Sequence, residues 1–236
     1  MARGKKPLLE NIEIKKIAAE GKSIAYVDEK VLFVPNTVPG DIVDVQVTRK
    51  RKSFLEGFIV NVRKYSDIRT EPFCSHFGIC GGCKWQNLPY QLQTEFKQQE
   101  IIDNLQRIGK VELQNVSPII GSPKTTYYRN KLEYTFCNKR FLTREEIANG
   151  QDIDRTPAVG FHVPGLFDKV IDIEKCYLQA EPSNGVRNFI REYAIEHELS
   201  FYDIREQAGF LRTLIIRTSS TGEVMVIVTF GEENRE

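Results

Sequence analysis

The sequence predicts a mainly β protein whose second part is α+β, and three observations lead to this fold class. Short alternating strands fill residues 11–65, three cysteines lie within residues 74–83, and strands and a helix follow residue 129. A chain of 236 residues that is 41% hydrophobic and 28% charged is long enough for two or more folded units. No apolar run reaches the ~18 residues of a membrane span, so we expect a cytoplasmic protein without a membrane partner.

The amino-terminal segment predicts a small β-barrel. Val43, Val45 and Val47 alternate with polar residues, which is the period of a half-buried strand, and residues 58–62 repeat the pattern. Pro39-Gly40-Asp41 supplies a turn. Five short strands in so short a segment favour a closed barrel, because closure removes the exposed edges of a sheet.

Basic charge is concentrated in this segment. Residues 1–70 contain 14 Lys and Arg against nine Asp and Glu, whereas residues 71–236 contain 19 against 23. The run Arg49-Lys50-Arg51-Lys52 lies between two strands and is expected at an exposed hairpin tip. A basic module on a mildly acidic body indicates an anionic partner, with nucleic acid the usual one, and a solvated basic face is the alternative.

The second part alternates between strands and helix. Leu132, Tyr134 and Phe136 alternate with polar residues and predict a strand, and hairpins are expected at residues 158–173 and 211–230. Between the hairpins, residues at helical spacing predict an amphipathic helix with a buried face of Val186, Phe189, Ile190, Tyr193, Ala194 and His197.

These patterns set the expected boundaries. A barrel occupies residues 1–67, a cysteine-rich loop and a helix occupy residues 68–110, and an α+β domain occupies residues 111–236. The helix is predicted from Pro89 to Ile108, where Gly109 suits its end.

The strongest local signal is the run Cys74-Ser-His-Phe-Gly-Ile-Cys80-Gly-Gly-Cys83. Two residues between Cys80 and Cys83 allow both thiolates to face one metal centre from a tight turn, and Cys74 can add a third ligand. Gly81 and Gly82 permit a positive φ and leave bare backbone N–H groups that can point at sulfur atoms. Five cysteines in all make a poor disulfide framework.

A fourth ligand must come from farther along the chain. Cys137 ends an alternating strand, where a buried small side chain is the simpler interpretation, whereas Cys176 lies in a loop that can aim it at the site. We therefore prefer Cys176, and expect His76 to pack beside the site although it is able to replace a thiolate. Zinc usually takes two C-x2-C pairs and the chain has one, so the layout favours an iron–sulfur cluster, with 2Fe–2S and 4Fe–4S not separated by spacing.

At this point the motifs resemble a known family. The run Cys74-x5-Cys80-Gly81-Gly82-Cys83-x2-Gln86, after a basic barrel and before Asp172-Ile173-Glu174-Lys175-Cys176, resembles the iron–sulfur RNA (uracil-5-)-methyltransferases. These act on 23S ribosomal RNA, with relatives that act on transfer RNA. Residues 8–66 resemble their TRAM domain, an OB-like RNA-binding barrel, and Tyr128-Arg129-Asn130-Lys131 resembles the start of their central domain. The resemblance implies a 4Fe–4S cluster on Cys74, Cys80, Cys83 and Cys176, with Cys137 left free.

The resemblance also implies an activity and partners. Such enzymes carry a carboxy-terminal Rossmann-like domain that binds S-adenosylmethionine and supplies the catalytic cysteine and base. No glycine-rich loop or nucleophile is assignable within these 236 residues, so we expect no catalytic residue here, S-adenosylmethionine bound only through that missing domain, and no activity from this chain alone. The expected partner is RNA, 23S ribosomal RNA ahead of transfer RNA, and the expected state is a monomer. The candidate RNA contacts are Arg49, Lys50, Arg51, Lys52, Arg129 and Lys131.

Two other functions stay open on the sequence. A stand-alone RNA-binding module with a structural metal would show the same barrel and cysteines. An iron–sulfur electron-transfer protein would leave the basic barrel unexplained. For Arg129 and Lys131 a solvated strand face is an equal alternative.

Overall fold

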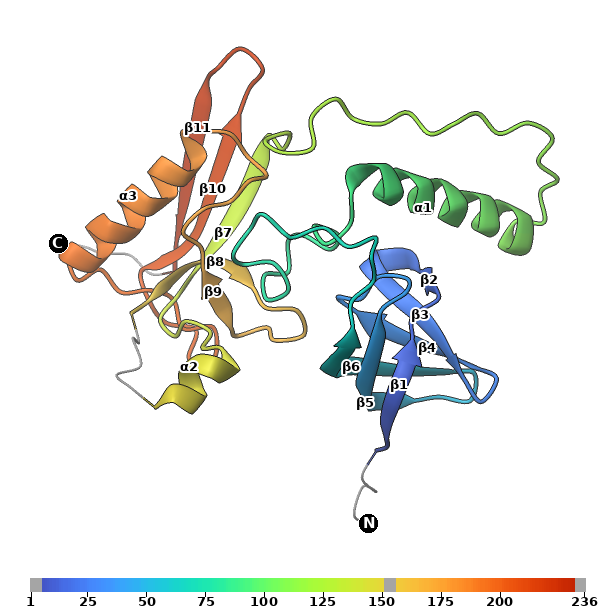
Figure 1. The fold of residues 1–236 in the computed structure, drawn as a ribbon. Coiled ribbons are helices and arrows are strands. Elements are labelled where there is room, and N and C mark those ends of the chain that lie inside the picture. The colour runs from blue at the N-terminus through green and yellow to red at the C-terminus, as the bar shows by residue number, and fades with distance from the viewer. Residues whose placement is uncertain (1–5, 151–155, 232–236) are drawn as a thin grey trace. The chain divides into compact units, whose positions relative to one another are not determined.

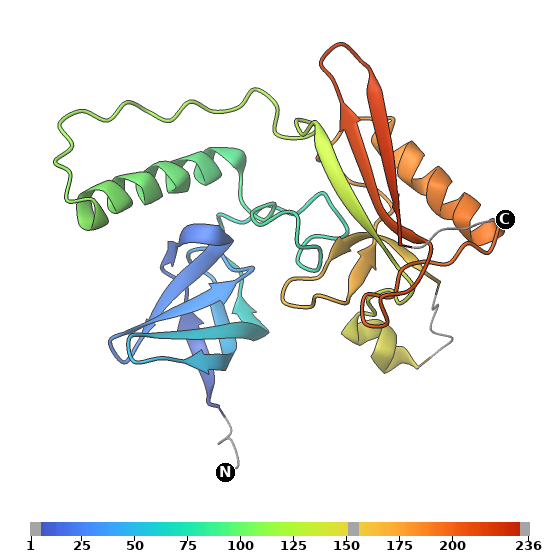
Figure 2. The same ribbon diagram turned by 180° about the vertical axis from the view of Figure 1, so that it is seen from behind.

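The computed structural model describes residues 6–150 and 156–231, which fold into two compact units (Figure 1, Figure 2). The first unit takes residues 1–73 and 84–122, and the second takes residues 74–83 and 123–236. The cysteine loop therefore belongs to the second unit, although the residues on both sides of it in sequence belong to the first. Among the described residues, no helix is long and apolar enough to cross a membrane.

The first unit is built on a six-stranded sheet. In spatial order its strands are β1 (Leu8–Glu13), β5 (Ile42–Lys50), β6 (Phe54–Lys64), β4 (Lys30–Pro35), β3 (Lys22–Val27) and β2 (Lys16–Ile17). All neighbours are antiparallel except β4 and β6, which run parallel. The alternating valines of β5 point into a core that they share with Leu32, Val34 and Leu55.

This sheet differs from the expected five-stranded closed barrel. The pairing order begins at β1 and ends at β2, which gives a half-barrel of six strands. The sixth strand, β2, has two residues, which is too short for an alternating pattern to reveal.

The rest of the first unit is a helix and the segments that flank it. Helix α1 (Tyr90–Asp103) continues into a π-helical turn (Asn104–Ile108), and Gly109 follows its end as predicted. The segment after the helix returns along it, because the Gln98 side chain bonds the Ser117 carbonyl at 3.1 Å and the Ile119 N–H at 2.9 Å.

The second unit is an antiparallel five-stranded sheet with helices. Its spatial order is β11 (Val224–Phe230), β10 (Leu211–Thr218), β7 (Lys131–Cys137), β8 (Ala158–His162) and β9 (Val170–Asp172). The predicted strand and both predicted hairpins are confirmed, and Leu132, Tyr134 and Phe136 are all buried. A short helix, α2 (Arg144–Asn149), begins with a capping box between Thr143 and Glu146.

Helix α3 (Ser183–Glu196) is present, and its predicted buried face is right for Val186, Ile190 and Ala194, which lie on the core, and wrong for the other three residues. Phe189 and Tyr193 are 66% and 48% exposed, and His197 is exposed as well. The fully buried side chains of the helix are Ser183, Asn184, Arg187 and Ala194. Asn184 and Arg187 are held on the buried side because they bond backbone groups of the 174–176 segment.

Candidate functional site

Four of the five thiols share one neighbourhood within the second unit. Cys74, Cys80 and Cys83 are half-buried in the 74–83 loop, and Cys176 is buried in the segment after β9. Cys80 and Cys176 both belong to the main core of this unit. The pKa of the Cys80 thiol is raised to about 11, mainly by burial and further by the thiols of Cys83, Cys176 and Cys74. The sulfur atoms are therefore close enough to act on one another electrostatically.

The 74–83 loop is shaped by short-range backbone contacts. Phe77 N–H donates to the Cys74 carbonyl at 3.0 Å, and Cys80 N–H donates to the His76 carbonyl at 2.9 Å. Gly82 N–H points at the Cys80 sulfur at 3.4 Å, as expected of a bare N–H in this loop. Gly81 and Gly82, which permit a positive φ, do not adopt one, and the loop turns through the left-handed region at Gly78 instead, with φ +88°.

Gly81 is required for a different reason, which is close packing. A Cβ atom at this position would lie 2.9 Å from the His162 carbonyl oxygen at the end of β8. At Gly82 a Cβ would meet only the Cys80 sulfur at 3.5 Å, an ordinary contact. The cysteine loop is thus pressed against the β8–β9 hairpin at one residue.

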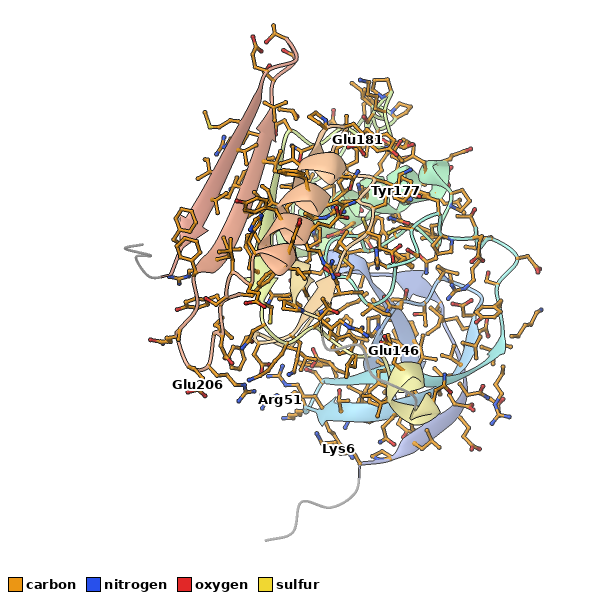
Figure 3. The ribbon with its side chains drawn as sticks, turned by 90° about the vertical axis from the view of Figure 1, so that its left-hand side faces the viewer. Lys6, Arg51, Glu146, Tyr177, Glu181 and Glu206 are labelled. Atoms are coloured by element: carbon orange, nitrogen blue, oxygen red, sulfur yellow. The ribbon has the colours of Figure 1, made fainter. Side chains whose placement is uncertain are left out.

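The segment that carries Cys176 is held by the first turns of α3. Asn184 Oδ1 accepts the Cys176 N–H at 2.7 Å, and Asn184 Nδ2 donates to the Cys176 carbonyl at 3.1 Å. Tyr177 and Glu181 lie in the segment that leads into α3 (Figure 3). His76 Nε2 accepts the Glu174 N–H at 3.2 Å, which ties the cysteine loop to this segment. Burial lowers the pKa of His76, so its ring nitrogen is available as that acceptor.

Cys137 lies in different surroundings. It is buried with Ala158 and Val170 in a cluster of its own, and its thiol donates to the Lys139 carbonyl at 3.2 Å. Burial raises its pKa, and the charged groups acting on it are Lys169, Asp203 and Asp168. It lines a cavity of about 160 Å³ together with Lys139, Asp168 and Asp203.

The four neighbouring thiols have the chemistry that an iron–sulfur cluster requires, but their sulfur atoms do not stand in the arrangement of a metal site. In the described part of the chain, no three His, Cys, Asp or Glu side chains stand in the arrangement of a bound metal ion. The donor set is nevertheless the one an iron–sulfur cluster takes, with four sulfurs and backbone N–H groups directed at two of them, Gly82 at Cys80 and Leu178 at Cys176. Burial raises the pKa of Cys80 and of Cys176, so these thiols must lose protons when a metal binds.

The predicted basic tip lies at the end of the β5–β6 hairpin. Arg49 and Lys50 close β5, Arg51 and Lys52 form the turn, and all four side chains are exposed (Figure 3). Arg49 lies 3.5 Å from Glu56 on the paired strand, an exposed contact that holds it weakly. The structure thus presents four cations at one end of the sheet.

Other arginines of the first unit have a structural role instead. Arg69 makes a two-pronged contact with the fully buried Asp41, at 2.8 and 2.7 Å. Arg63 lies 2.7 Å from the buried Asp44. The first unit also has exposed rings that the sequence pattern does not reveal, namely those of Tyr26, Phe58 and Tyr65, and Arg69 lies over the last of these at 5.0 Å from the ring centre.

Arg129 and Lys131 belong to the second unit, just before and at the start of β7, whereas the basic hairpin tip belongs to the first unit. Lys131 pairs with Glu133 at 3.2 Å, and both side chains are about half exposed. Arg129 is exposed beside Tyr128, and its N–H donates to the Leu178 carbonyl at 2.8 Å. None of the described contacts of these two side chains indicates RNA binding.

Comparison with known proteins decides the nature of the half-barrel, since residues 10–60 match the model of the TRAM domain. The chain contains a TRAM domain. This domain covers most of the six-stranded sheet, including β5 and the first part of β6 with the basic tip between them.

Proteins similar to the whole chain are named RNA methyltransferases. An uncharacterized RNA methyltransferase of Bacteroides thetaiotaomicron is 57% identical over 212 residues, which is 90% of this chain and 47% of that protein. Another, from Porphyromonas gingivalis, is 50% identical over 229 residues, covering 94% of this chain and 49% of that protein. The chain spans about half the length of the curated relatives it matches.

A solved structure matches both units. The Pyrococcus abyssi tRNA (uracil-54, C5)-methyltransferase, in complex with S-adenosyl-L-homocysteine, superposes with a TM-score of 0.65 at 25% sequence identity. The match covers 96% of this chain and 47% of that one.

These matches correct one expectation. We predicted an inactive chain because its catalytic domain would be missing. The named RNA methyltransferases align with 90% or more of this chain, and the solved methyltransferase aligns with 96% of it, so nearly all of this sequence has a counterpart in proteins of that name. The prediction of a chain that is inactive because it lacks the catalytic domain is therefore wrong.

Proposed function

We propose that this protein is an S-adenosylmethionine-dependent RNA (uracil-5-)-methyltransferase of the cytoplasm that binds RNA through its TRAM domain. The observation that carries the proposal is the combination of a TRAM match at residues 10–60 with RNA methyltransferase relatives along the rest of the chain. The solved neighbour is named for a uracil C5 methyl transfer and holds the demethylated cofactor product, which supports the same reaction and cofactor here.

The chain's own residues would act on the RNA before any chemistry takes place. The cations Arg49, Lys50, Arg51 and Lys52 would hold phosphates, and the exposed ring of Tyr26 offers a stacking face to an unpaired base. A buried base must leave its stack to be methylated, so gripping the flanking nucleotides lowers the cost of presenting it. S-adenosylmethionine would supply the methyl group.

We also propose a 4Fe–4S cluster on Cys74, Cys80, Cys83 and Cys176. The shared neighbourhood of these thiols and the separate surroundings of Cys137 support this assignment. Bound there, the cluster would join the 74–83 loop to the segment before α3. His76 already bonds the loop to this segment at Glu174, and Asn184 holds Cys176 within the segment.

The reaction is tested with the full protein, methyl-labelled S-adenosylmethionine and two substrates, a 23S ribosomal RNA transcript and a transfer RNA transcript. We expect 5-methyluridine in the digested nucleosides of one of them. The sequence favours the ribosomal RNA, whereas the solved neighbour is named for transfer RNA, so the two arms decide the substrate. Label in another nucleoside, or none in either RNA, would contradict the proposal.

A further inference from the structure

Arg187 is a buried cation without an anionic partner. Its side chain is fully buried in α3 and donates to neutral groups, namely Asn184 Oδ1 at 3.1 Å, the Glu174 carbonyl at 2.5 Å and Asn188 Oδ1 at 2.9 Å. Its guanidinium carbon also lies 5.2 Å from the centre of the Tyr134 ring, a further contact that carries no negative charge. Its Nε has no hydrogen-bond partner, and within the described residues no carboxylate bonds it directly. The carboxylate of Glu181 acts on it only from beyond Asn184, whose Nδ2 donates to Glu181 Oε1 at 2.8 Å. Burying an unpaired charge is costly, so this position calls for a compensating anion.

Other arginines of the chain show what ordinary compensation looks like. Arg191, one turn later on α3, lies 2.7 Å from Asp172, and Arg140 lies 2.8 Å from Glu146. Of these three arginines, Arg187 is the most deeply buried, and it is the one without a direct ion pair to a described carboxylate.

The Arg187 guanidinium is connected to Cys176, the fourth proposed ligand, by hydrogen bonds through Asn184. Asn184 Oδ1 accepts from Arg187 and from the Cys176 N–H, and Asn184 Nδ2 returns a bond to the Cys176 carbonyl. The Glu174 carbonyl accepts from Arg187 while the Glu174 N–H donates to His76. Arg187 therefore holds the segment 174–176 at both ends, directly at Glu174 and through Asn184 at Cys176.

We propose that Arg187 is the counter-charge of the cysteine-bound cluster and the residue that positions Cys176. This inference rests on the cluster under the proposed function. A cluster held by four thiolates is negatively charged, and one-electron reduction adds a further negative charge. A buried cation beside it stabilises the thiolate-bound form, and stabilises the reduced form most, because charge interactions are strong where water is excluded.

The test uses the full chain, reconstituted anaerobically with iron and sulfide. Iron and sulfide per chain are measured, and the midpoint potential is followed by dithionite titration. Arg187→Met should shift the potential to a more negative value and lose the cluster faster in air, and Arg187→Lys should lie between this variant and the wild type. Arg191→Met is the matched control, because it removes a cation from the same helix at a partly exposed ion pair.

The outcomes separate this inference from the cluster itself. A wild-type protein that takes up no iron overturns both. A wild-type cluster whose potential and lifetime are unchanged in Arg187→Met overturns the role of Arg187 alone. If Arg187→Met does not fold, Asn184→Asp places a carboxylate on the same guanidinium and neutralises it with the side chain in place. A potential unchanged by Asn184→Asp would then overturn the inference.

Discussion

Cys176 and Cys137 are both buried thiols of the second unit, and their surroundings assign them different chemistry. Cys176 lies in an irregular segment held by side-chain hydrogen bonds, with two other thiols acting on its pKa. Cys137 lies at the end of a regular strand, where its neighbours are small apolar side chains and a Lys carbonyl. A metal ligand needs a sulfur that can approach other ligands, and only the first environment provides it.

Serine substitution of these two cysteines should therefore have unequal effects. Cys176→Ser should lose most of the bound iron and sulfide, because a hydroxyl is a poor ligand for an iron–sulfur cluster. Cys137→Ser should retain the wild-type content. Iron and sulfide analysis of anaerobically purified protein measures both, and equal losses from the two variants, or zinc in place of iron, would contradict the assignment.

Gly81 and Gly82 provide a second pair of neighbouring residues with opposite expectations. Gly81→Ala would bring a Cβ 2.9 Å from the His162 carbonyl, so the loop must move from β8 at a cost of ~1–3 kcal/mol. Gly82→Ala meets only a sulfur at 3.5 Å and neither glycine has a positive φ, so this control should unfold like the wild type. Denaturant unfolding compares them, and equal stabilities would mean that the loop does not press on β8.

At the scale of elements, the β5–β6 hairpin concentrates charge where the sheet ends. Four adjacent cations repel one another unless anions or solvent screen them. On this hairpin one of the four, Arg49, has a nearby carboxylate, that of Glu56. A hairpin tip also contributes little to the core beneath it, so its charge is free to serve binding.

Replacing Arg49, Lys50, Arg51 and Lys52 with Gln should change the salt dependence of RNA binding. Each phosphate contact on a single strand contributes about 0.7 to the slope of log K against log salt, so two or three contacts predict a slope flatter by roughly 1.4–2.1. The loss should be similar for unrelated RNA sequences. Lys16→Gln with Lys22→Gln on β2 and β3 is the control, and an unchanged slope in a folded hairpin variant would leave these cations as a solvated face.

The turn between β10 and β11 supplies an acid-sensitive element. Hydrogen bonds from Ser219 and then Thr221 lower the pKa of Glu223 from an ordinary 4.5 to about 2. A carboxyl group whose pKa is lower in the folded than in the unfolded state stabilises the fold at any pH above its pKa in the unfolded chain. This contribution is lost as the pH falls from about 4.5 to 2. The stability difference between wild type and Glu223→Gln should therefore be constant near neutrality and shrink over that window. Urea unfolding at several pH values checks this, and a difference independent of pH would contradict it.

At the scale of the whole molecule, all four proposed ligands belong to one unit. The 74–83 loop and Cys176 are both assigned to the second unit, and the TRAM sheet contributes none of them. Metal binding is coupled to the folding of the residues that supply ligands, so its effect should be confined to that unit.

Removing iron should therefore destabilise one unit only. In hydrogen–deuterium exchange, amides of β8, β9 and residues 174–178 should exchange faster after chelation, whereas those of β5 and β6 should keep their protection. Cys137→Ser protein treated in the same way should respond like the wild type. Equal loosening of the TRAM sheet would show that the cluster supports the whole chain.

Regular hydrophobic patterns predicted the strands and their buried faces. Positions whose burial is decided by polar contacts could not be predicted from the sequence. The alternation of Leu132, Tyr134 and Phe136 identified β7 and its buried face, because a pleated strand repeats every two residues. Arg187 was missed, since a charged residue inside a helix is exposed by default and its partners come from a loop whose path no local pattern encodes. The exposed rings of Phe189 and Tyr193 were misplaced for the same reason.

The path of the chain between the two units limits how such proteins can recombine. The polypeptide crosses from one unit to the other after residues 73, 83 and 122. A chimera of two homologous genes joined at any single point between residues 84 and 175 takes its cysteine loop from one parent and Cys176 from the other. The TRAM domain therefore cannot be exchanged by one crossover in that interval without also exchanging three of the four proposed ligands. A single crossover between residues 65 and 73, by contrast, exchanges the TRAM domain and keeps all four proposed ligands with one parent.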